Sequence, residues 1–349
     1  MKYQVKLAGS SKQYEAAADE SLLEAALFND IHLPYGCQSG GCGACRARLV
    51  AGQIEYPYEP PALSPAEKAA GYILLCQAQA RTAVTVAIEE LPQDHAIPVR
   101  NMPVRVENRE LLCHDVMQLR LKLPKGEAFE FLAGQYIDIL MRDGRRRSFS
   151  MASPPELKGC IELQLRHVPG GDFTDQVFNS MPDRAILRLE GPLGNFYLRE
   201  DSTRPILMLA GGTGIAPLWS ILRHMQAKAL RRPVKLFWGV RAQRDLYLHE
   251  ALEAFAQDNP WFDYCPVLSD ASADDNWPGA QGFVHEAVLE QVANIAAHEV
   301  YMSGPPVMIK AAQNSFTERG LPMTQLHYDS FDYAHETWPD RESGAQAST

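Results

Sequence analysis

Three cysteines stand close together near the start of the chain, at Cys37, Cys42 and Cys45, and a fourth, Cys76, follows at a distance. Four thiolates in this order can enclose one small inorganic group, which constrains the path of the chain on both sides of it. The loop between the first three is rich in glycine, at Gly40, Gly41 and Gly43. Because glycine has no Cβ, it permits the positive φ angles and the close approach that such a loop needs.

The C-x4-C-x2-C order with a remote fourth cysteine predicts a [2Fe–2S] cluster with all four cysteines as metal ligands. A zinc ribbon uses two C-x2-C pairs about 15–20 residues apart, whereas only Cys42 and Cys45 form such a pair here. A thioredoxin-type C-x-x-C should open a helix, and a set of structural disulfides fits poorly with a cytosolic chain. We expect the other three cysteines, Cys113, Cys160 and Cys265, to be small buried apolar residues in strands.

The length of 349 residues allows two or three domains. A formal net charge of −10 disfavours nucleic acid as a partner but permits docking to a basic patch on another protein. The first residues alternate like a strand and lack the apolar run of a signal peptide, so we expect a cytoplasmic protein. The uncharged stretch 205–222 is interrupted by glycines and Pro217, which favours a strand, a loop and a helix over a membrane span.

Residues 1–92 form the first predicted domain. Apolar residues at Tyr3, Val5 and Leu7 alternate with polar ones and predict a strand. Capping boxes at Ser21 and Ser64 predict two helix starts, the second of them on the way to the fourth cysteine. Strands around one helix, with a cluster loop at the edge, resemble the β-grasp ferredoxin fold.

Two further domains are predicted downstream. The proline-containing stretch from Glu89 to Pro103 has little periodicity and predicts a linker, which we assign to 93–100. Residues 101–200 contain short amphipathic strands and an Asp143-Gly144 turn signal, which predict an antiparallel β-barrel. Residues 203–332 alternate apolar strands with helices, which predicts an α/β domain with a parallel sheet. We expect the polar segment 333–349 to be a flexible tail.

Two segments of the second domain together suggest a pyrophosphate site. Arg147-Ser148-Phe149-Ser150 follows the predicted turn, and Gly170-Gly171-Asp172-Phe173-Thr174 is a glycine turn that enters a helix. A helix N-terminus with free N–H groups, together with an arginine, can hold a pyrophosphate.

These segments resemble the R-x-Y-S/T strand and the glycine turn of ferredoxin-NADP reductase-like flavoproteins, and Gly134-Gln135-Tyr136 is similar to the G-Q-Y/F that precedes them in that family. The resemblance implies bound FAD, with Arg147 on its pyrophosphate, Phe149 packed on the flavin side chain and Ser150 near flavin N5. Phe149 stands where the family usually has tyrosine. The FAD-binding residues implied in this way are Arg147, Ser148, Phe149, Ser150, Gly171, Phe173 and Thr174.

The third domain carries two segments that are similar to the nicotinamide site of the same family. Gly211-Gly212-Thr213-Gly214-Ile215-Ala216-Pro217 follows a predicted strand and opens a helix, and Ser303-Gly304-Pro305-Pro306-x-Met308 resembles C-G-P-P-x-M with serine in place of cysteine. The resemblance implies NAD(P)H bound by Gly211, Gly212, Thr213, Gly214, Pro217, Gly304 and Pro305. It also implies catalytic roles for Ser150 and Ser303, and for Phe331 as an aromatic cover of the flavin; as an alternative, Phe331 is a core residue of the last strand.

The order of the three domains resembles the reductase components of ring-hydroxylating dioxygenases and multicomponent monooxygenases, and equally the CDP-6-deoxyglucoseen (CDP-4-dehydro-6-deoxyglucose) reductases of deoxysugar synthesis. The resemblance implies an NAD(P)H-dependent enzyme, with NADH favoured, that passes electrons through FAD and [2Fe–2S] to an oxygenase component or a dehydrase docked near the cluster loop. Two alternatives remain open: a zinc-stabilised binding module without enzymatic activity, and a self-contained oxidase or ferric reductase. No membrane partner is expected.

Overall fold

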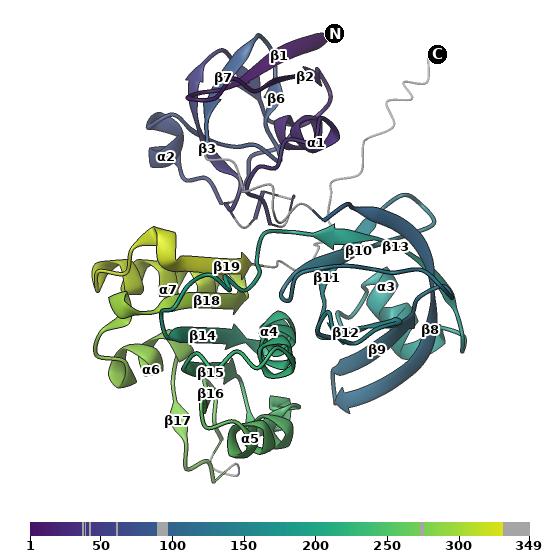
Figure 1. The fold of residues 1–349 in the computed structure, drawn as a ribbon, viewed down its shortest axis with the longest axis vertical. Helices are drawn as coiled ribbons and strands as arrows, with labels where there is room; N and C mark the ends of the chain where they lie inside the picture. Colours follow the sequence, from purple (N-terminus) through teal and green to yellow (C-terminus); the bar gives the residue numbers. More distant parts are fainter. Residues whose placement is uncertain are drawn as a thin grey trace, which may run out of the picture.

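The computed structural model describes residues 1–36, 38, 40–41, 43–60, 62–88, 97–272 and 276–330. Its elements form three groups that follow one another along the chain (Figure 1). Cys37, Cys42 and Phe331, which carry predicted roles, lie outside the described residues, as does the predicted tail 333–349.

The first group is a mixed sheet with a helix packed on it. Its strand order is β2-β1-β7-β3-β5, in which β1 and β7 are parallel and the other neighbours are antiparallel. The strands are β1 (Lys2–Leu7), β2 (Gln13–Ala17), β3 (Arg46–Ala51), β5 (Tyr72–Leu74) and β7 (Val84–Ala87), with β4 (Ile54–Glu55) and β6 (Gln79–Ala80) as a separate pair. Leu22 and Leu23 of helix α1 (Leu22–Phe28) are fully buried in the same core as Val5 and Val86.

Both predicted capping boxes are confirmed. Ser21 Oγ accepts a hydrogen bond from the backbone N–H of Glu24, the Glu24 carboxylate accepts one from the Ser21 N–H, and α1 starts there. Ser64 and Glu67 do the same at helix α2 (Pro65–Ala69), which has proline in its first turn. Each box satisfies two N–H groups that a helix start otherwise leaves unpaired.

The second group is a six-stranded sheet in which all neighbours are antiparallel, in the order β11-β10-β13-β8-β9-β12. The two edge strands approach each other, since Met151 after β11 forms a bridge with Leu163 of β12. The elements are β8 (Arg100–Cys113), β9 (Val116–Lys122), β10 (Tyr136–Leu140), β11 (Arg146–Ser150), β12 (Cys160–Arg166), β13 (Ile186–Leu193), helix α3 (Asp172–Asp175) and the π-helical turn η2 (Gln176–Ser180).

The prediction that the linker extends to Pro103 is wrong, because β8 already begins at Arg100. Pro103 pairs with Arg188 of β13, whereas the pairing of β8 with β9 starts only at Arg105. Strand β8 therefore has an open side at Pro103, and a residue without an N–H is tolerated at such a position. The prediction for the three other cysteines is correct for Cys160, which is buried, but Cys113 and Cys265 are only half-buried.

The third group is a parallel sheet covered by helices on both faces, which confirms the predicted parallel sheet. Helices α4 and α5 share one buried cluster with the sheet, and α6 and α7 share another. The strands, in the order β17-β16-β15-β14-β18-β19, are β14 (Ile206–Gly211), β15 (Val234–Val240), β16 (Phe262–Leu268), β17 (Ala280–Gln281), β18 (Glu299–Gly304) and β19 (Leu326–Ser330). The helices are α4 (Ile215–Ala227), α5 (His249–Asp258), α6 (Val284–Gln291) and α7 (Pro306–Glu318), with 3₁₀ turns η3 (Gly212–Gly214), η4 (Gln243–Asp245), η6 (Ile295–Ala297) and η7 (Met323–Gln325).

The stretch 205–222 is a strand, a turn and a helix, as expected: β14, η3 and the start of α4. Among the residues that the structure describes, no helix has both the length and the apolar character needed to cross a bilayer. Strand β14 has β15 on one side and β18 on the other. The chain continues from β14 to β15 on one side and from β18 to β19 on the other, so the order of strands reverses at this point, where parallel sheets bind ligands beyond their carboxyl ends.

Side chains join the three groups. Ser220 of α4 donates a hydrogen bond to the carbonyl of Ser153 at 2.7 Å, which ties the third group to the second. Tyr136 and Leu193 of the second group lie in the same buried cluster as the core of the first. The first group thus sits above the junction of the other two, near the start of β10 and the end of β19 (Figure 1).

Candidate functional site

Two of the four predicted metal ligands are described, and they come together. Cys45 and Cys76 are buried, with 2% and 7% of their surfaces exposed, and the backbone N–H of Cys76 donates to Cys45 Sγ at 3.5 Å. The loop needs glycine at Gly40 and Gly43, whose φ angles are 81° and 78°. A Cβ at Gly40 would also lie 3.0 Å from Cβ of Pro60. Two buried sulfur donors beside a tight glycine loop fit a [2Fe–2S] cluster.

The predicted FAD strand β11 is partly exposed to solvent, whereas the neighbouring strand β10 is mostly buried. Arg147, Ser148, Phe149 and Ser150 on β11 are all at least partly exposed, whereas most of β10 beside them is buried. β11 is an edge strand of its sheet. Such a surface offers both side chains and backbone to a bound cofactor.

Three predicted FAD residues belong to one turn. A Cβ at Gly171 would lie 2.8 Å from Thr174 Oγ1 and 2.9 Å from the Val168 carbonyl oxygen, so only glycine fits there. Thr174 Oγ1 donates to that carbonyl at 3.1 Å and closes the turn. Phe173 is buried, and its ring centroid lies 5.4 Å from that of Phe149. Phe173 and Thr174 thus shape the turn, and Phe173 supports the ring of Phe149 from behind.

Ser150 reaches across to the parallel sheet. Its Oγ donates a hydrogen bond to Oδ2 of Asp329 at 3.1 Å. Asp329 lies in β19 and is paired in register with Ser303 of β18. Two predicted catalytic residues, Ser150 and Ser303, are therefore brought to one place through Asp329. Asp329 has no role that local sequence spacing predicts, because its partner Ser150 is distant in sequence.

The loops after β14 and β18 touch backbone to backbone. A Cβ at Gly214 would lie 2.0 Å from the carbonyl oxygen of Ser303, and one at Gly211 would lie 2.6 Å from Sδ of Met308. Neither position admits a side chain, so both glycines of this predicted nicotinamide loop are required by packing. Pro217 is buried in the first turn of α4, whereas Pro305 is exposed after β18.

Ser303 is fully buried, and its Oγ has no hydrogen-bond partner among the residues that the structure describes. A buried hydroxyl without a partner costs free energy, and few native polar groups remain in that state. The loop therefore holds one unused hydrogen-bonding group at the carboxyl end of the sheet. This fits a nicotinamide dinucleotide bound there.

Arg166 is a further residue at this place that the sequence analysis missed. It ends β12, and its guanidinium lies 3.5 Å from the position that a Cβ of Gly212 would occupy. The Gly212 carbonyl in turn accepts a hydrogen bond from Trp238 Nε1 at 2.9 Å. A positive charge beside a glycine loop suits the phosphates of a dinucleotide. The signal was an arginine four residues before the glycine turn of the FAD motif.

Three family profiles match consecutive parts of the chain. They describe a 2Fe-2S iron-sulfur cluster binding domain at residues 5–81, an oxidoreductase FAD-binding domain at 103–197 and an oxidoreductase NAD-binding domain at 208–314.

Similar proteins span nearly the whole chain. The CDP-6-deoxy-L-threo-D-glycero-4-hexulose-3-dehydrase reductase of Yersinia pestis is 37% identical, with 95% of this chain and 99% of the relative covered. The terephthalate 1,2-dioxygenase reductase component 1 of a Comamonas species is 32% identical, with 95% and 98% covered. The solved cytochrome P450 reductase GcoB of Amycolatopsis is 30% identical with a TM-score of 0.79, covering 95% of this chain and 100% of that one.

Fold, site and profiles together define an NAD(P)H-dependent flavin and iron–sulfur oxidoreductase. The chain belongs to the family of iron–sulfur flavoprotein reductases that these relatives represent. It carries electrons from NAD(P)H through FAD and a [2Fe–2S] cluster to an electron-accepting partner protein.

Proposed function

We propose that the flavin and the nicotinamide meet beside Ser150, Asp329 and Ser303. The observation that carries this proposal is the hydrogen bond from Ser150 to Asp329 at 3.1 Å, which joins the FAD strand to the strand next to Ser303. A hydride can pass only between groups that are held in contact. A place where the predicted residues for both cofactors converge supports that contact.

The remaining residue roles follow from the same arrangement. We assign the cluster to Cys37, Cys42, Cys45 and Cys76. We assign FAD to Arg147, Ser148, Phe149, Ser150, Gly171, Phe173 and Thr174, and NAD(P)H to Gly211, Gly212, Thr213, Gly214, Pro217, Gly304 and Pro305. Phe331 keeps its proposed role over the flavin on the resemblance alone.

When bound, NAD(P)H supplies a hydride, FAD converts its electron pair into single electrons, and the cluster accepts them one at a time. The chain holds and orients these groups. Ser150 Oγ donates a hydrogen bond to Asp329, so its lone pairs stay available to accept a hydrogen bond from a bound ligand. Ser303 offers its unused hydroxyl, and Arg147 and Arg166 offer positive charge to pyrophosphate.

We also propose the finer fold assignments. The parallel pairing of β1 with β7 under α1 supports a β-grasp for domain 1–92. The bridge between Met151 and Leu163 supports a closed antiparallel barrel for domain 101–200. The domain of 203–332 completes the molecule, with 93–100 as linker and 333–349 as a flexible tail.

For the acceptor we propose first an oxygenase component that docks near the Gly36–Cys45 loop, with NADH as the preferred donor. The similarity to a cytochrome P450 reductase and to a dioxygenase reductase component supports this choice. A deoxysugar dehydrase is the second candidate, favoured by the higher identity of 37% to a dehydrase reductase.

The route is tested with the variant Cys45→Ser, and Cys265→Ser, in a half-buried site on β16, is the matched control. We expect Cys45→Ser to lose electron transfer to the acceptor while NADH still bleaches the flavin at the wild-type rate. The control should keep both steps. Loss of flavin reduction in Cys45→Ser would argue against the ordered route, and purified wild-type protein without flavin or iron would refute it.

A further inference from the structure

Tyr136 connects the FAD strand to the cluster loop. It begins β10 and lies directly opposite Ser150 of β11 in the antiparallel register. Side chains of directly opposed residues project from the same face of a sheet. The Tyr136 hydroxyl donates to the carbonyl oxygen of Gly36 at 2.7 Å and accepts from Gln38 Nε2 at 3.2 Å. Gly36 and Gln38 flank Cys37 in the sequence, so one phenol is bonded on both sides of a predicted cluster ligand.

The ring of Tyr136 is fixed as firmly as its hydroxyl. Only 6% of Tyr136 is exposed, and it is buried in the core cluster of the cluster-binding domain although it belongs to the FAD domain. Gly194 leaves room for the ring, since a Cβ there would lie 2.7 Å from Tyr136 Cε1. Burial raises the pKa of Tyr136 well above its ordinary value of 10.

The contacts around Tyr136 hold the same loop. Asn195 Nδ2 donates to the Leu33 carbonyl at 3.2 Å, and the Asn195 N–H donates to the Tyr35 carbonyl at 3.2 Å. From within the cluster-binding domain, Gln77 Nε2 donates to the Gln38 carbonyl at 2.8 Å. Each of these bonds satisfies a backbone carbonyl of the segment that leads into or through the cluster loop.

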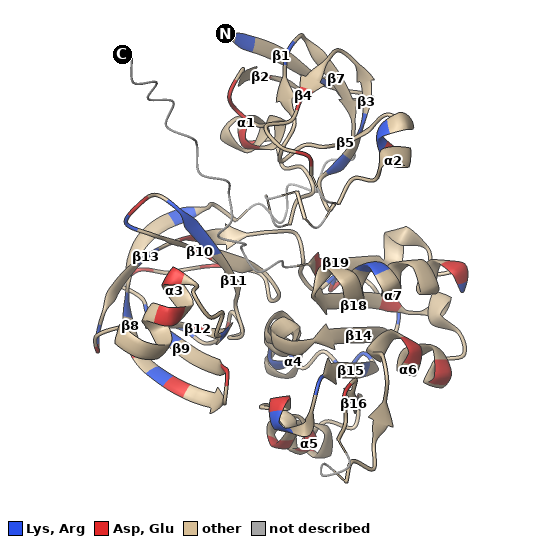
Figure 2. Ribbon diagram, turned by 180° about the vertical axis from the view of Figure 1, so that it is seen from behind, with Lys and Arg blue, Asp and Glu red and all other residues tan. Residues whose placement is uncertain are grey.

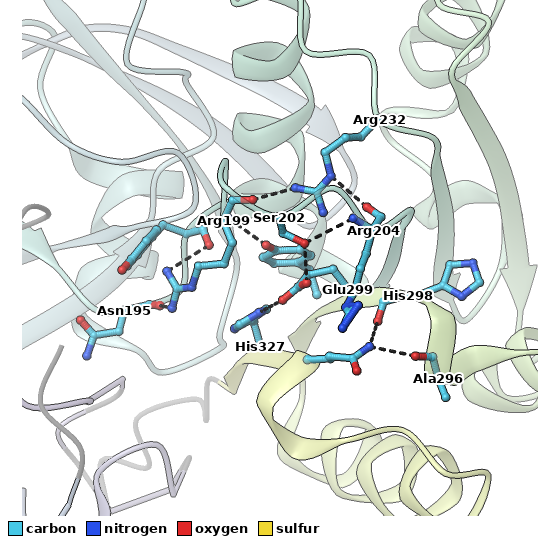
Figure 3. A network of polar contacts seen from close by, with 12 residues as sticks. Asn195, Arg199, Ser202, Arg204, Arg232, Ala296, His298, Glu299 and His327 are labelled. Carbon is cyan, nitrogen blue, oxygen red and sulfur yellow. Dashed lines mark hydrogen bonds and ion pairs between the residues drawn. The ribbon is translucent and has the colours of Figure 1, made fainter. Parts of the chain in front are cut away.

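The same segment is tied to the nicotinamide domain. Arg199 Nη2 donates to the carbonyl of Asn195 at 3.3 Å, and the Arg199 N–H donates to the hydroxyl of Tyr301 in β18 at 2.9 Å. Figure 3 shows this network continuing from Asn195 through Arg199 to Glu299 and His327. The segment from Asn195 to Arg199 therefore contacts both the cluster-binding domain and the nicotinamide domain.

We propose that Tyr136 is a positioning residue that seats the cluster loop on the strand carrying Ser150 and so sets the rate of electron transfer from flavin to cluster. This inference rests on the proposed function. Tyr136 is neither oxidised nor deprotonated in the step, because the one electron that the cluster gains is the one that the flavin gives up. Its hydroxyl acts by holding the FAD domain and the cluster-binding domain in a fixed relative position.

The test compares Tyr136→Phe with Tyr14→Phe in the full-length protein loaded with flavin and cluster. Tyr14 is equally buried and donates to the Leu22 carbonyl at 2.9 Å, but both residues lie within the cluster-binding domain. Each variant loses one phenol-to-carbonyl hydrogen bond, and only Tyr136→Phe loses it between domains. Rapid mixing with NADH in the absence of oxygen separates flavin reduction from cluster reduction.

In Tyr136→Phe we expect flavin reduction at the wild-type rate and cluster reduction slower by about tenfold or more, because the variant loses both the bond to the Gly36 carbonyl and the bond from Gln38 Nε2. Hydrogen exchange should rise in peptides covering 33–38 and 193–195. Tyr14→Phe should keep both rates and show faster exchange only near 14–25. Asn195→Ala, which loses the bond to Leu33, should follow Tyr136→Phe in direction.

The proposal would be overturned if Tyr136→Phe reduced its cluster at the wild-type rate and showed unchanged hydrogen exchange at residues 33–38. Equal slowing in both tyrosine variants would overturn it as well, since a general loss of stability would then explain the effect. Failure of the proposed function is separable, because it shows in the wild-type protein as absence of flavin, of iron or of NADH-driven cluster reduction.

Discussion

The hydroxyl of Ser303 is a group that the fold buries without using. It is fully buried at the carboxyl end of β18 and has no hydrogen-bond partner among the described residues. Ser153 is also fully buried, yet its Oγ accepts a hydrogen bond from the Glu162 N–H at 3.1 Å. The two serines have the same size and burial and differ in whether the fold needs the hydroxyl.

We therefore expect Ser303→Ala to change the rate of flavin reduction without reducing the stability, and Ser153→Ala to change the stability but not the rate. Ser303→Ala should leave stability unchanged or raise it by up to about 1 kcal/mol, and should slow flavin reduction by NADH roughly tenfold, the effect of one hydrogen bond. Ser153→Ala should lose about 1 kcal/mol of stability and keep the rate. Thermal unfolding and rapid-mixing absorbance measure the two quantities. A destabilised Ser303→Ala with a normal rate would mean that the hydroxyl serves the fold.

Single residues were predictable where the cause is local. Ser21 and Ser64 act within their own first helical turns, and the glycine loop after β14 is read from adjacent residues. Asp329 and Tyr136 could not be assigned in this way, because their partners Ser150 and Gly36 are distant in sequence. Their roles depend on the packing of whole domains, and no local spacing carries that information.

At the scale of elements, the carboxylate of Glu299 connects the last two strands to the segment that leads into β14. Glu299 of β18 contacts His327 of β19 at 2.6 Å and accepts from Ser202 Oγ at 2.8 Å. Burial alone would raise the pKa of Glu299, but the hydrogen bonds from His327 and Ser202 and the nearby charge of Arg232 outweigh it and lower the pKa below the ordinary 4.5. Figure 3 shows His327 and Ser202 bonded to the Glu299 carboxylate.

Glu299→Gln should therefore destabilise the protein in a pH-dependent way. A group with a lowered native pKa stabilises the fold above its ordinary value of 4.5, and this stabilisation is lost as the pH falls through the lowered pKa. We expect the variant to be less stable by about 1–3 kcal/mol at pH 7, since hydrogen bonds to a charged group are among the stronger ones, and we expect this difference in stability to shrink as the pH falls below 4.5. Thermal unfolding across this range measures it.

Glu290→Gln on the exposed surface of α6 is the control and should have no effect. If the loss of stability in Glu299→Gln were the same at low pH, the charge of Glu299 would not be what stabilises these contacts.

Strands and helices were predictable from periodicity, except for the start of β8, which lies within the predicted linker. The apolar run of β14 and the alternation in β1 and β9 identify strands directly. The stretch up to Pro103 suggested a linker because it contains several prolines and has little periodicity, yet β8 begins at Arg100 and is unpaired on one side at Pro103, where proline is tolerated. Which side of a strand is open is a property of the assembled sheet, so sequence alone could not resolve it.

At the scale of the whole molecule, the three predicted domains are joined by side-chain contacts between residues that are distant in sequence. Tyr136, Asn195 and Ser150 are among the residues that make these contacts, and no local pattern marks the residues they contact. The order of domains along the chain was readable from motifs. Their mutual placement was not, because it depends on single hydrogen bonds between surfaces.

Net charge, in contrast, acts over the whole molecule and leads to a prediction about the partner. The formal net charge is −10, and Figure 2 shows Asp and Glu on α3, α5 and α6, so the negative charge is not confined to one patch. Such a field attracts a partner with a basic docking surface and speeds its encounter. Salt weakens the attraction, since charges are screened beyond about 10 Å at 0.1 M ionic strength.

Electron transfer to the acceptor should accordingly slow by about tenfold between low and high salt, the usual range for steered association. Reduction of the protein's own cluster by NADH, measured without acceptor, is intramolecular after nucleotide binding and should change little at saturating NADH. An uncharged osmolyte at matched concentration controls for viscosity and hydration. An acceptor rate that is constant or rises with salt would mean that the partner surface is neutral or acidic, and docking would then depend on apolar contacts around the cluster loop.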